Sequence, residues 1–276
     1  MTPAERDTEE WQYWRAIALL RTGQTLAAHT ALGELSKERS YYGFLAADHL
    51  QRPYQMNDSR ISYEKEQLQD VEQIPGILRA RELYLAGKHL DARREWYHTT
   101  ASLSEHELKL LALLAHRWGW HDRAILTASR AGYWSDLTLR FPLPHRKSIF
   151  AYADQYDLDP ALIYGVIRQE SAFMEDARSP VGALGLMQLM PQTGKQTARS
   201  LKIRYLGNQA LLHSDQNIRL GSAYLNKLLK RYNGSPVLAA AAYNAGPHRV
   251  SRWLPTGKSM DASLWMERIP FKETRH

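Results

Sequence analysis

The sequence has 276 residues, of which 44% are hydrophobic and 24% are charged. This composition is typical of a folded globular protein and excludes disordered and collagen-like chains, and the length suggests about two domains. The sequence contains no cysteine, which excludes disulfides, thiolate metal sites and cysteine nucleophiles. Its longest charge-free stretches, residues 179–194 and 232–248, contain proline and glycine and are shorter than the roughly 20 apolar residues of a membrane span.

The positive charge of the chain is concentrated in its C-terminal part. Residues 1–140 hold 18 basic and 19 acidic side chains, a net charge of −1, whereas residues 141–276 hold 18 basic and 10 acidic ones, a net charge of +8. A basic surface favours an anionic partner such as an acidic polymer, nucleic acid or membrane. No run of five or more lysines and arginines is present, so the sequence gives no support for a nucleic-acid-binding arm.

The N-terminal half shows a repeated pattern in which a glycine is followed by an alanine five residues later. The three instances are Gly23 with Ala28, Gly87 with Ala92, and Gly119 with Ala124. A glycine suits the tight turn between two helices, and the small alanine lets the second helix pack closely. The spacing fits a unit of about 32 residues, near the tetratricopeptide period, and predicts stacked helix pairs. Residues 54–75 interrupt this pattern and mark a boundary between two helical blocks.

The C-terminal part begins after a proline-rich joint at residues 141–145. Asp159 and Pro160 are a typical N-cap and first residue of a helix, which we predict to run over residues 161–173. Glu170 continues the apolar stripe of this helix, so we expect burial to raise the pKa of its carboxyl towards neutrality. A carboxyl protonated at neutral pH is suited to general-acid cleavage of a glycosidic bond. The alternative is that Glu170 turns to solvent at a frayed helix end.

Two further segments carry candidate substrate-binding residues. In the turn-rich stretch 179–194, Gln188 and Met190 alternate with Leu189, so an extended backbone would direct both side chains to one side, towards a sugar. The alternative is a core methionine and a surface glutamine. Residues 215–232 form a predicted scaffold helix, and Ser235 begins a short alanine-rich helix.

Tyr243 and Asn244 are the first polar groups where the alanine-rich helix emerges. The alternative for Tyr243 is a core tyrosine whose hydroxyl is satisfied internally. The 11 histidines form no recognisable metal-ligand pattern. We therefore predict no metal and no cofactor.

Four motifs resemble those of the soluble lytic murein transglycosylases, and they occur in the order found in that family. They are Gln169-Glu170-Ser171, Gly185-Leu-Met-Gln-Leu-Met-Pro191, Ala242-Tyr-Asn-Ala-Gly246 and Ile269-Pro-Phe-Lys-Glu-Thr-Arg275. The resemblance implies a mainly α fold: tetratricopeptide-like helix pairs of an α-superhelix, followed by an α-rich catalytic domain similar to goose-type lysozyme. It places the end of the superhelical domain at 1–74, a helical linker domain at 75–140 and the lysozyme-like domain at 141–276.

The resemblance also implies an activity, that of a carbon–oxygen lyase acting on peptidoglycan in cell wall turnover and recycling. Such an enzyme cleaves the β-1,4 bond between N-acetylmuramic acid and N-acetylglucosamine and leaves a 1,6-anhydromuramic acid end. One carboxylate suffices, because the N-acetyl group of the substrate assists, and the matching residue is Glu170. The residues that would bind substrate are Ser171, Gln188, Met190, Tyr243, Asn244 and Glu273.

The expected partners are peptidoglycan glycan strands and, as further candidates, proteins of cell wall synthesis, in a periplasmic location. Members of the family begin with a secretory signal and a long helical domain, and they continue beyond the fourth motif. We therefore expect the present sequence to be truncated at both ends. Two alternatives remain: a lysozyme-type muramidase, for which Glu175 and Asp176 lie near in sequence as second carboxylates, and a helical scaffold without catalytic activity.

Overall fold

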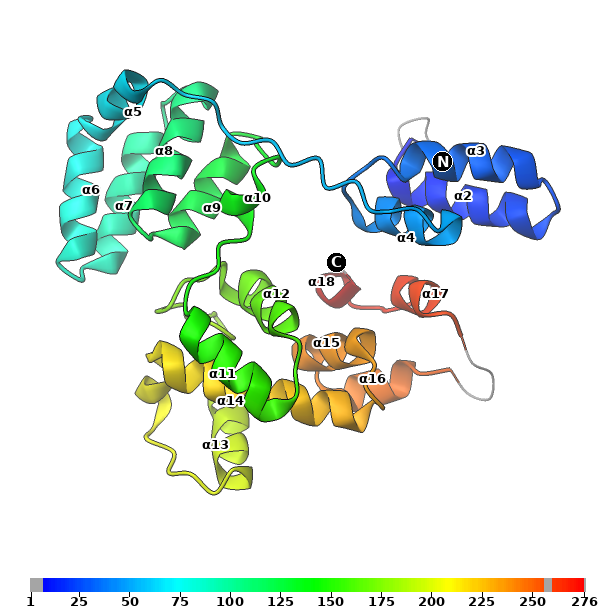
Figure 1. Ribbon diagram of the computed structural model, residues 1–276. Helices are drawn as coiled ribbons and strands as arrows, with labels where there is room; N and C mark the ends of the chain where they lie inside the picture. The colour runs from blue at the N-terminus through cyan, green and yellow to red at the C-terminus, as the bar shows by residue number, and fades with distance from the viewer. Residues whose placement is uncertain (1–6, 256–259, 276) are drawn as a thin grey trace. The chain divides into compact units, whose positions relative to one another are not determined.

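The computed structural model describes residues 7–255 and 260–275, and nearly all of its regular structure is helical (Figure 1). Its β structure is confined to isolated bridges that Leu184 forms with Arg178 and with Leu189. The described residues thus confirm the mainly α fold. The chain divides into two compact units, one of residues up to 62 together with 133–137, the other of residues 63–132 and from 138 onwards.

From residue 7 onwards, the first unit contains three helices joined by short turns. These are α2 (Glu9–Arg21), α3 (Thr25–Leu35) and α4 (Tyr41–Leu50). Gly23 adopts a φ of 80° in the turn between α2 and α3, a conformation that favours glycine. Ala28 is fully buried, as the pattern predicted. Residues 133–137 return to this unit, where the Leu137 N–H donates to the Asp58 carboxylate at 2.9 Å.

The second unit begins with helix pairs. They are α5 (Lys65–Glu72), α6 (Pro75–Leu85), α7 (His89–Thr100), α8 (Glu105–Arg117) and α9 (His121–Arg130). Gly87 and Gly119 have φ values of 73° and 75° in the turns that precede α7 and α9. Ala92 and Ala124 are both fully buried. The predicted pairing of helices across a glycine turn is therefore confirmed here, with α6 against α7 and α8 against α9 (Figure 1).

The remainder of the second unit is a cluster of helices around α14. It is entered through α10 (Leu137–Arg140), whose first residue still belongs to the first unit. In chain order there follow α11 (Arg146–Tyr156), α12 (Pro160–Ser171), α13 (Pro191–Ser200), the 3-10 helix η1 (Asn208–Leu212), α14 (Ser214–Arg231), α15 (Pro236–Ala245), α16 (Pro247–Trp253), α17 (Ala262–Glu267) and α18 (Lys272–Arg275). Helix α14 packs against α11, α13, η1 and α15. Its Ile218, Leu220 and Leu225 side chains are fully buried, so α14 is the predicted scaffold helix and forms the centre of the core.

Helix α12 ends earlier than the sequence predicted. The predicted range was 161–173, but the helix stops at Ser171. Ala172 and Phe173 have φ values of 49° and 69°, which lie in the left-handed region and cannot continue a right-handed helix. The chain turns away directly after Glu170 and Ser171 as a result.

Among residues 7–255 and 260–275, no helix has both the length and the hydropathy that crossing a membrane requires.

Candidate active site

A cavity of about 430 Å³ lies beside the last turns of α12. Its walls come from α12, from α15 and from residues 266–275, which include the end of α17 and most of α18. Of the residues singled out in the sequence, it brings together Glu170, Tyr243, Asn244 and Glu273. The cavity thus joins three of the four sequence motifs.

Glu170 reaches the cavity because of how α12 begins and packs. The Asp159 carboxylate accepts from the Ala161 N–H at 2.8 Å, and Pro160 occupies the first helical position. Ile163 and Ile167 are fully buried and fix the orientation of the helix. Glu170 lies on the same side one turn later, at the edge of the core, and is half-buried.

The carboxyl of Glu170 titrates near neutral pH, so its protonated and ionised forms are both present there. Burial raises the pKa of Glu170 from its ordinary 4.5 to about 7, and the negative charge of Glu273 in the same cavity raises it further in the same direction. Desolvation disfavours the charged form of a carboxyl, and a like charge nearby does the same. The group can therefore donate a proton at neutral pH and accept one afterwards.

Tyr243 lies opposite α12, on the alanine-rich helix α15. Ser235 caps this helix by accepting from the Leu238 N–H at 3.4 Å, and the fully buried Ala239 and Ala242 allow close packing against α14. The Tyr243 hydroxyl donates to the Met187 carbonyl at 2.8 Å. Burial and the proximity of Glu170 raise the pKa of Tyr243 well above its ordinary value, so the hydroxyl stays neutral.

The end of the chain completes the cavity. Helix α18 packs against α15, and the Thr274 hydroxyl donates to the Asn244 side-chain oxygen at 2.5 Å. This contact holds Glu273 in the cavity wall next to α15. The fourth sequence motif therefore contributes a second carboxylate to the site.

The prediction that Gln188 and Met190 lie on one side of an extended stretch is wrong. Residues 185–188 form a turn, and Gln188 has a left-handed φ of 45°. Its side-chain amide donates to the carbonyls of Gly185 at 2.9 Å and Ala177 at 3.3 Å. Met190 is 41% exposed and precedes α13. The turn depends on glycine at position 185, where φ is 73° and an added Cβ would clash with the Leu211 carbonyl oxygen.

The Ser171 side chain hydrogen-bonds to the backbone at the C-terminal end of α12. Its hydroxyl donates to the Ile167 carbonyl and accepts from the Phe173 N–H, each at 3.2 Å. Ser171, Gln188 and Met190 are not among the described residues that line the Glu170 cavity. Their assignment as substrate-binding residues stays a prediction.

Sequence reasoning missed several residues of this region. Gln169, Thr274 and Arg275 also line the cavity, and all three are part of the motifs. A further omission is Asn217 on α14, which is fully buried and holds the 184–189 turn through its side-chain amide. The sequence did offer a signal for Asn217: it lies four residues before Gly221 and eight before Leu225, so helical spacing puts it on the buried side of α14.

The described residues contain no group of three or more histidine, cysteine, aspartate or glutamate side chains that could hold a metal ion.

Two family models match the sequence. The transglycosylase SLT domain matches residues 147–266, and the soluble lytic murein transglycosylase L domain matches residues 70–137. The first match contains α12, the 184–189 turn and α15, and the second contains the helix pairs from α6 to α9.

Known proteins match over nearly the whole chain. The soluble lytic murein transglycosylase of Salmonella typhimurium is 34% identical over 98% of this chain and 42% of its own length. An inactive glutamate-to-glutamine mutant of the lytic transglycosylase Slt from Pseudomonas aeruginosa has a TM-score of 0.95 and 42% identity over 100% of this chain and 45% of its own. The 70-kDa soluble lytic transglycosylase of Escherichia coli has a TM-score of 0.94 and 32% identity, over 100% of this chain and 44% of its own.

The chain spans less than half the length of these relatives. Within that span the resemblance is confirmed by both domain matches, by the identities and by the fold. The chain therefore belongs to the soluble lytic murein transglycosylase family, of which it carries the L domain followed by the SLT domain.

Proposed function

We propose that this chain is a lytic transglycosylase that cleaves the glycan strands of peptidoglycan. The observation that carries the proposal is the half-buried Glu170, whose pKa is raised to about 7 in a cavity formed by the family motifs. The relative from Pseudomonas aeruginosa is inactive as a glutamate-to-glutamine mutant, which supports an essential glutamate in that enzyme. We assign the equivalent role here to Glu170.

In the proposed reaction, Glu170 acts first as an acid and then as a base. Its proton passes to the oxygen of the β-1,4 bond as the bond to the muramic acid C1 breaks, and the N-acetyl group of that sugar supports C1 from the opposite face. The Glu170 carboxylate then takes the proton of the C6 hydroxyl, whose oxygen bonds to C1. The proton returns to Glu170, no water is consumed, and the product carries a 1,6-anhydromuramic acid end.

The remaining motif residues are proposed to hold the sugars. Tyr243 and Asn244 line the cavity and offer polar groups beside Glu170. Ser171, Gln188 and Met190 come from adjoining segments outside the cavity lining, and we assign them to more distant parts of the glycan. Glu273 contributes its negative charge, which supports the protonated state of Glu170.

The charge of the catalytic part suits this polymer. Residues 141–276 carry 18 basic and 10 acidic side chains, a net charge of +8. Peptidoglycan carries carboxylates on its stem peptides and lactyl groups, so a basic surface attracts it. Because this substrate lies outside the cytoplasmic membrane, we infer a periplasmic location, which fractionation of cells expressing the natural gene would test.

The rate of cleavage is expected to fall as the pH rises through about 7. The proton donor is the protonated form of Glu170, and above its pKa of about 7 that form decreases about tenfold per pH unit. Glu273→Gln should move the alkaline limb of the kcat/KM profile to lower pH, because the charge that raises the pKa of Glu170 is lost. This role of Glu170 would be contradicted if the alkaline limb of the kcat/KM profile lay well away from pH 7 and did not move in Glu273→Gln.

The proposed function is tested by the mass of the products. Purified sacculi are digested with the chain, and the released muropeptides are weighed, with Glu170→Gln as the control. Products one water lighter than the hydrolytic muropeptides establish 1,6-anhydro ends and support the proposal. Release of no products by a folded protein would refute it and favour the scaffold alternative.

A muramidase is the second candidate, and the position of Glu273 favours it. A hydrolase needs a second carboxylate to activate water or form a covalent intermediate, and Glu273 lines the same cavity as Glu170. Glu175 and Asp176 do not serve this role, because they line a different cavity and are engaged with His145 and Arg93. Fully hydrated reducing ends in the same experiment would identify a muramidase.

A further inference from the structure

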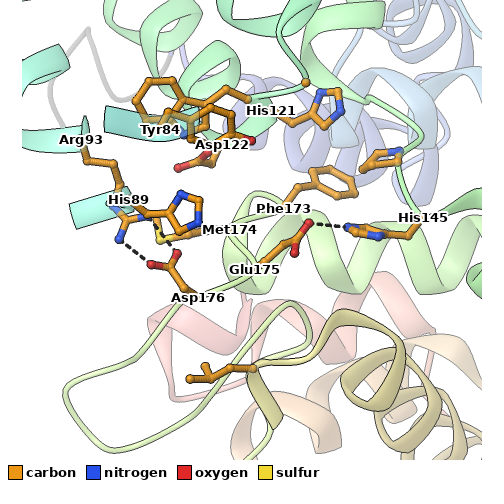
Figure 2. Close-up of a pocket in the computed structure, with 14 residues that line it drawn as sticks. Tyr84, His89, Arg93, His121, Asp122, His145, Phe173, Met174, Glu175 and Asp176 are labelled. Atoms are coloured by element: carbon orange, nitrogen blue, oxygen red, sulfur yellow. Dashed lines mark hydrogen bonds and ion pairs between the residues drawn. The ribbon is translucent and has the colours of Figure 1, made fainter. Parts of the chain in front are cut away.

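A second cavity, of about 300 Å³, lies where the L domain meets the catalytic domain within the second compact unit. On the L-domain side it is lined by residues of α7 and by the start of α9. On the catalytic side it is lined by His145 and by residues 173–176, the segment that leaves α12 just after Glu170. Figure 2 shows Arg93 of α7 directed at Asp176, and His145 directed at Glu175.

Arg93 and Asp176 form a two-point contact between the domains. The two terminal nitrogens of Arg93 donate to the two carboxylate oxygens of Asp176, each at 2.8 Å. The Arg93 side chain is only 17% exposed. Burial raises the pKa of Asp176, but the hydrogen bonds and charge of Arg93 outweigh it, so its pKa lies below the usual range. The pair stays ionised, and its parallel geometry fixes direction as well as distance.

The residue after Asp176 connects this contact to the proposed glycan site. The Ala177 carbonyl accepts from the Gly185 N–H at 2.9 Å and from the Gln188 side-chain amide at 3.3 Å. These bonds attach the 184–189 turn to the segment that Arg93 holds. The same turn presents the Met187 carbonyl that accepts from the Tyr243 hydroxyl at 2.8 Å. A displacement of Asp176 would therefore reach both Gln188 and Tyr243.

The neighbouring residue Glu175 has a different anchor, which lies wholly in the catalytic domain. Its carboxylate contacts the His145 ring at 3.2 Å and accepts from the Ser214 hydroxyl at 2.8 Å. Asp176 is thus the point at which this segment is tied to the L domain through an ion pair. Loss of Arg93 would leave Glu175 held and release Asp176 alone.

We propose that Arg93 of the L domain is a positioning residue for glycan binding, which it supports by fixing Asp176, Ala177 and the 184–189 turn. This inference rests on the proposed function for its effect on catalysis, but its effect on the turn is independent of that function. It gives the L domain a direct part in shaping the catalytic site.

The test combines hydrogen exchange with kinetics in the 276-residue chain. Arg93→Met removes the ion pair, and Arg79→Met is the matched control, because Arg79 pairs at 2.7 Å with Glu95 inside the L domain. We expect exchange of the backbone amides in residues 183–190 to rise at least about tenfold in Arg93→Met and to stay unchanged in Arg79→Met. Arg93→Lys should give an intermediate rise, because lysine keeps the charge and loses the two-point geometry.

Kinetics on soluble peptidoglycan fragments give the second measurement. Arg93→Met should raise KM at least about tenfold and change kcat less, because the turn is proposed to bind substrate rather than to transfer protons. Asp176→Ala should have the same effect, and the double variant should be no worse than either single one. A purely structural role would lower the melting temperature and leave KM unchanged.

The outcomes separate the two proposals. Unchanged exchange in residues 183–190 of a folded Arg93→Met protein overturns the positioning role, whatever the activity. Additive losses in the double variant also overturn it. Faster exchange in a chain whose wild type releases no products from sacculi supports the positioning of the turn and refutes the proposed function instead.

Discussion

Replacing Glu170 with glutamine is expected to reduce glycan cleavage by at least about a hundredfold, the lower range for loss of a general acid–base group. Glutamine keeps the size and the hydrogen-bonding shape of the side chain but cannot donate a proton to the glycosidic oxygen or take one from the C6 hydroxyl. Glu170 combines a place in the cavity wall with a pKa raised to about 7. Release of muropeptides from sacculi, followed with time, measures the loss.

The same substitution should leave the protein at least as stable at pH 8 as the wild type. The pKa of Glu170 is raised in the folded state, from 4.5 to about 7, so the folded protein binds this proton more tightly than the unfolded chain. The contribution of Glu170 to stability is therefore complete below about pH 4.5 and is lost as the pH rises through about 7. At pH 8 the wild type holds a half-buried carboxylate, which glutamine removes. Urea unfolding at pH 5 and pH 8 tests this expectation.

A matched control is Asp154→Asn, which makes the same carboxyl-to-amide change on the exposed side of α11. We expect it to retain full cleavage activity. If Glu170→Gln kept more than a few per cent of the activity of this control, with both proteins folded, the assignment of Glu170 as the proton donor would be wrong.

Replacing Asn217 with alanine is expected to lower the free energy of unfolding by about 3 kcal/mol or more, since each buried polar group left unsatisfied costs about 1–3 kcal/mol. Asn217 has no exposed surface. Its side-chain oxygen accepts from the Met187 N–H at 2.7 Å, and its nitrogen donates to the carbonyls of Leu184 at 2.9 Å and Leu211 at 2.7 Å. Alanine cannot form any of these three hydrogen bonds, and the backbone groups that lose them are buried away from water.

Urea unfolding measures this change, and Asn208→Ala is the control. Asn208 begins the 3-10 helix and accepts from the Tyr205 hydroxyl at 3.0 Å in an exposed position, so its removal should change stability by less than about 0.5 kcal/mol. Asn217→Asp should be as damaging as Asn217→Ala, because it loses both donors and buries a charge. Equal stabilities of Asn217→Ala and Asn208→Ala would show that the turn is held by other contacts.

The Asn217 substitution should also reduce activity in the molecules that remain folded. Met187 donates its N–H to Asn217 and accepts at its carbonyl from Tyr243, so one residue of the turn joins the core to the cavity wall. Releasing the first bond loosens the second. Comparing kcat/KM per folded molecule at a temperature well below the transition measures this effect.

The sequence alone determined the elements whose signals are local. Gly23, Gly87 and Gly119 predicted tight turns, and each has a positive φ in the structure. The cap at Asp159 and the alanine-rich helix after Ser235 were also predicted, and both caps form. These features depend on backbone conformation and on hydrogen bonds between residues two to five positions apart. The residues next to each feature in the sequence are therefore enough to predict it.

The periodicity of α12 also indicated the environment of Glu170. Three apolar residues at helical spacing placed its carboxyl at the edge of the core, and burial is the main cause of its raised pKa. The motifs supplied the family and the candidate residues. They did not supply the second cause, the charge of Glu273, because the nearness of Glu273 depends on how α18 docks on α15.

Only the tertiary structure decided which distant residues meet. The extended stretch expected at Gln188 is a turn in the structure, and the turn is held by hydrogen bonds between the backbone of Met187 and Leu184 and the side chain of Asn217, which lies about 30 residues later in the chain. The contact of Arg93 with Asp176 joins two domains, and the hydrophobic periodicity of neither segment predicts it. A helical pattern shows which face is buried, whereas the partner of that face is set by the packing of segments far apart in sequence.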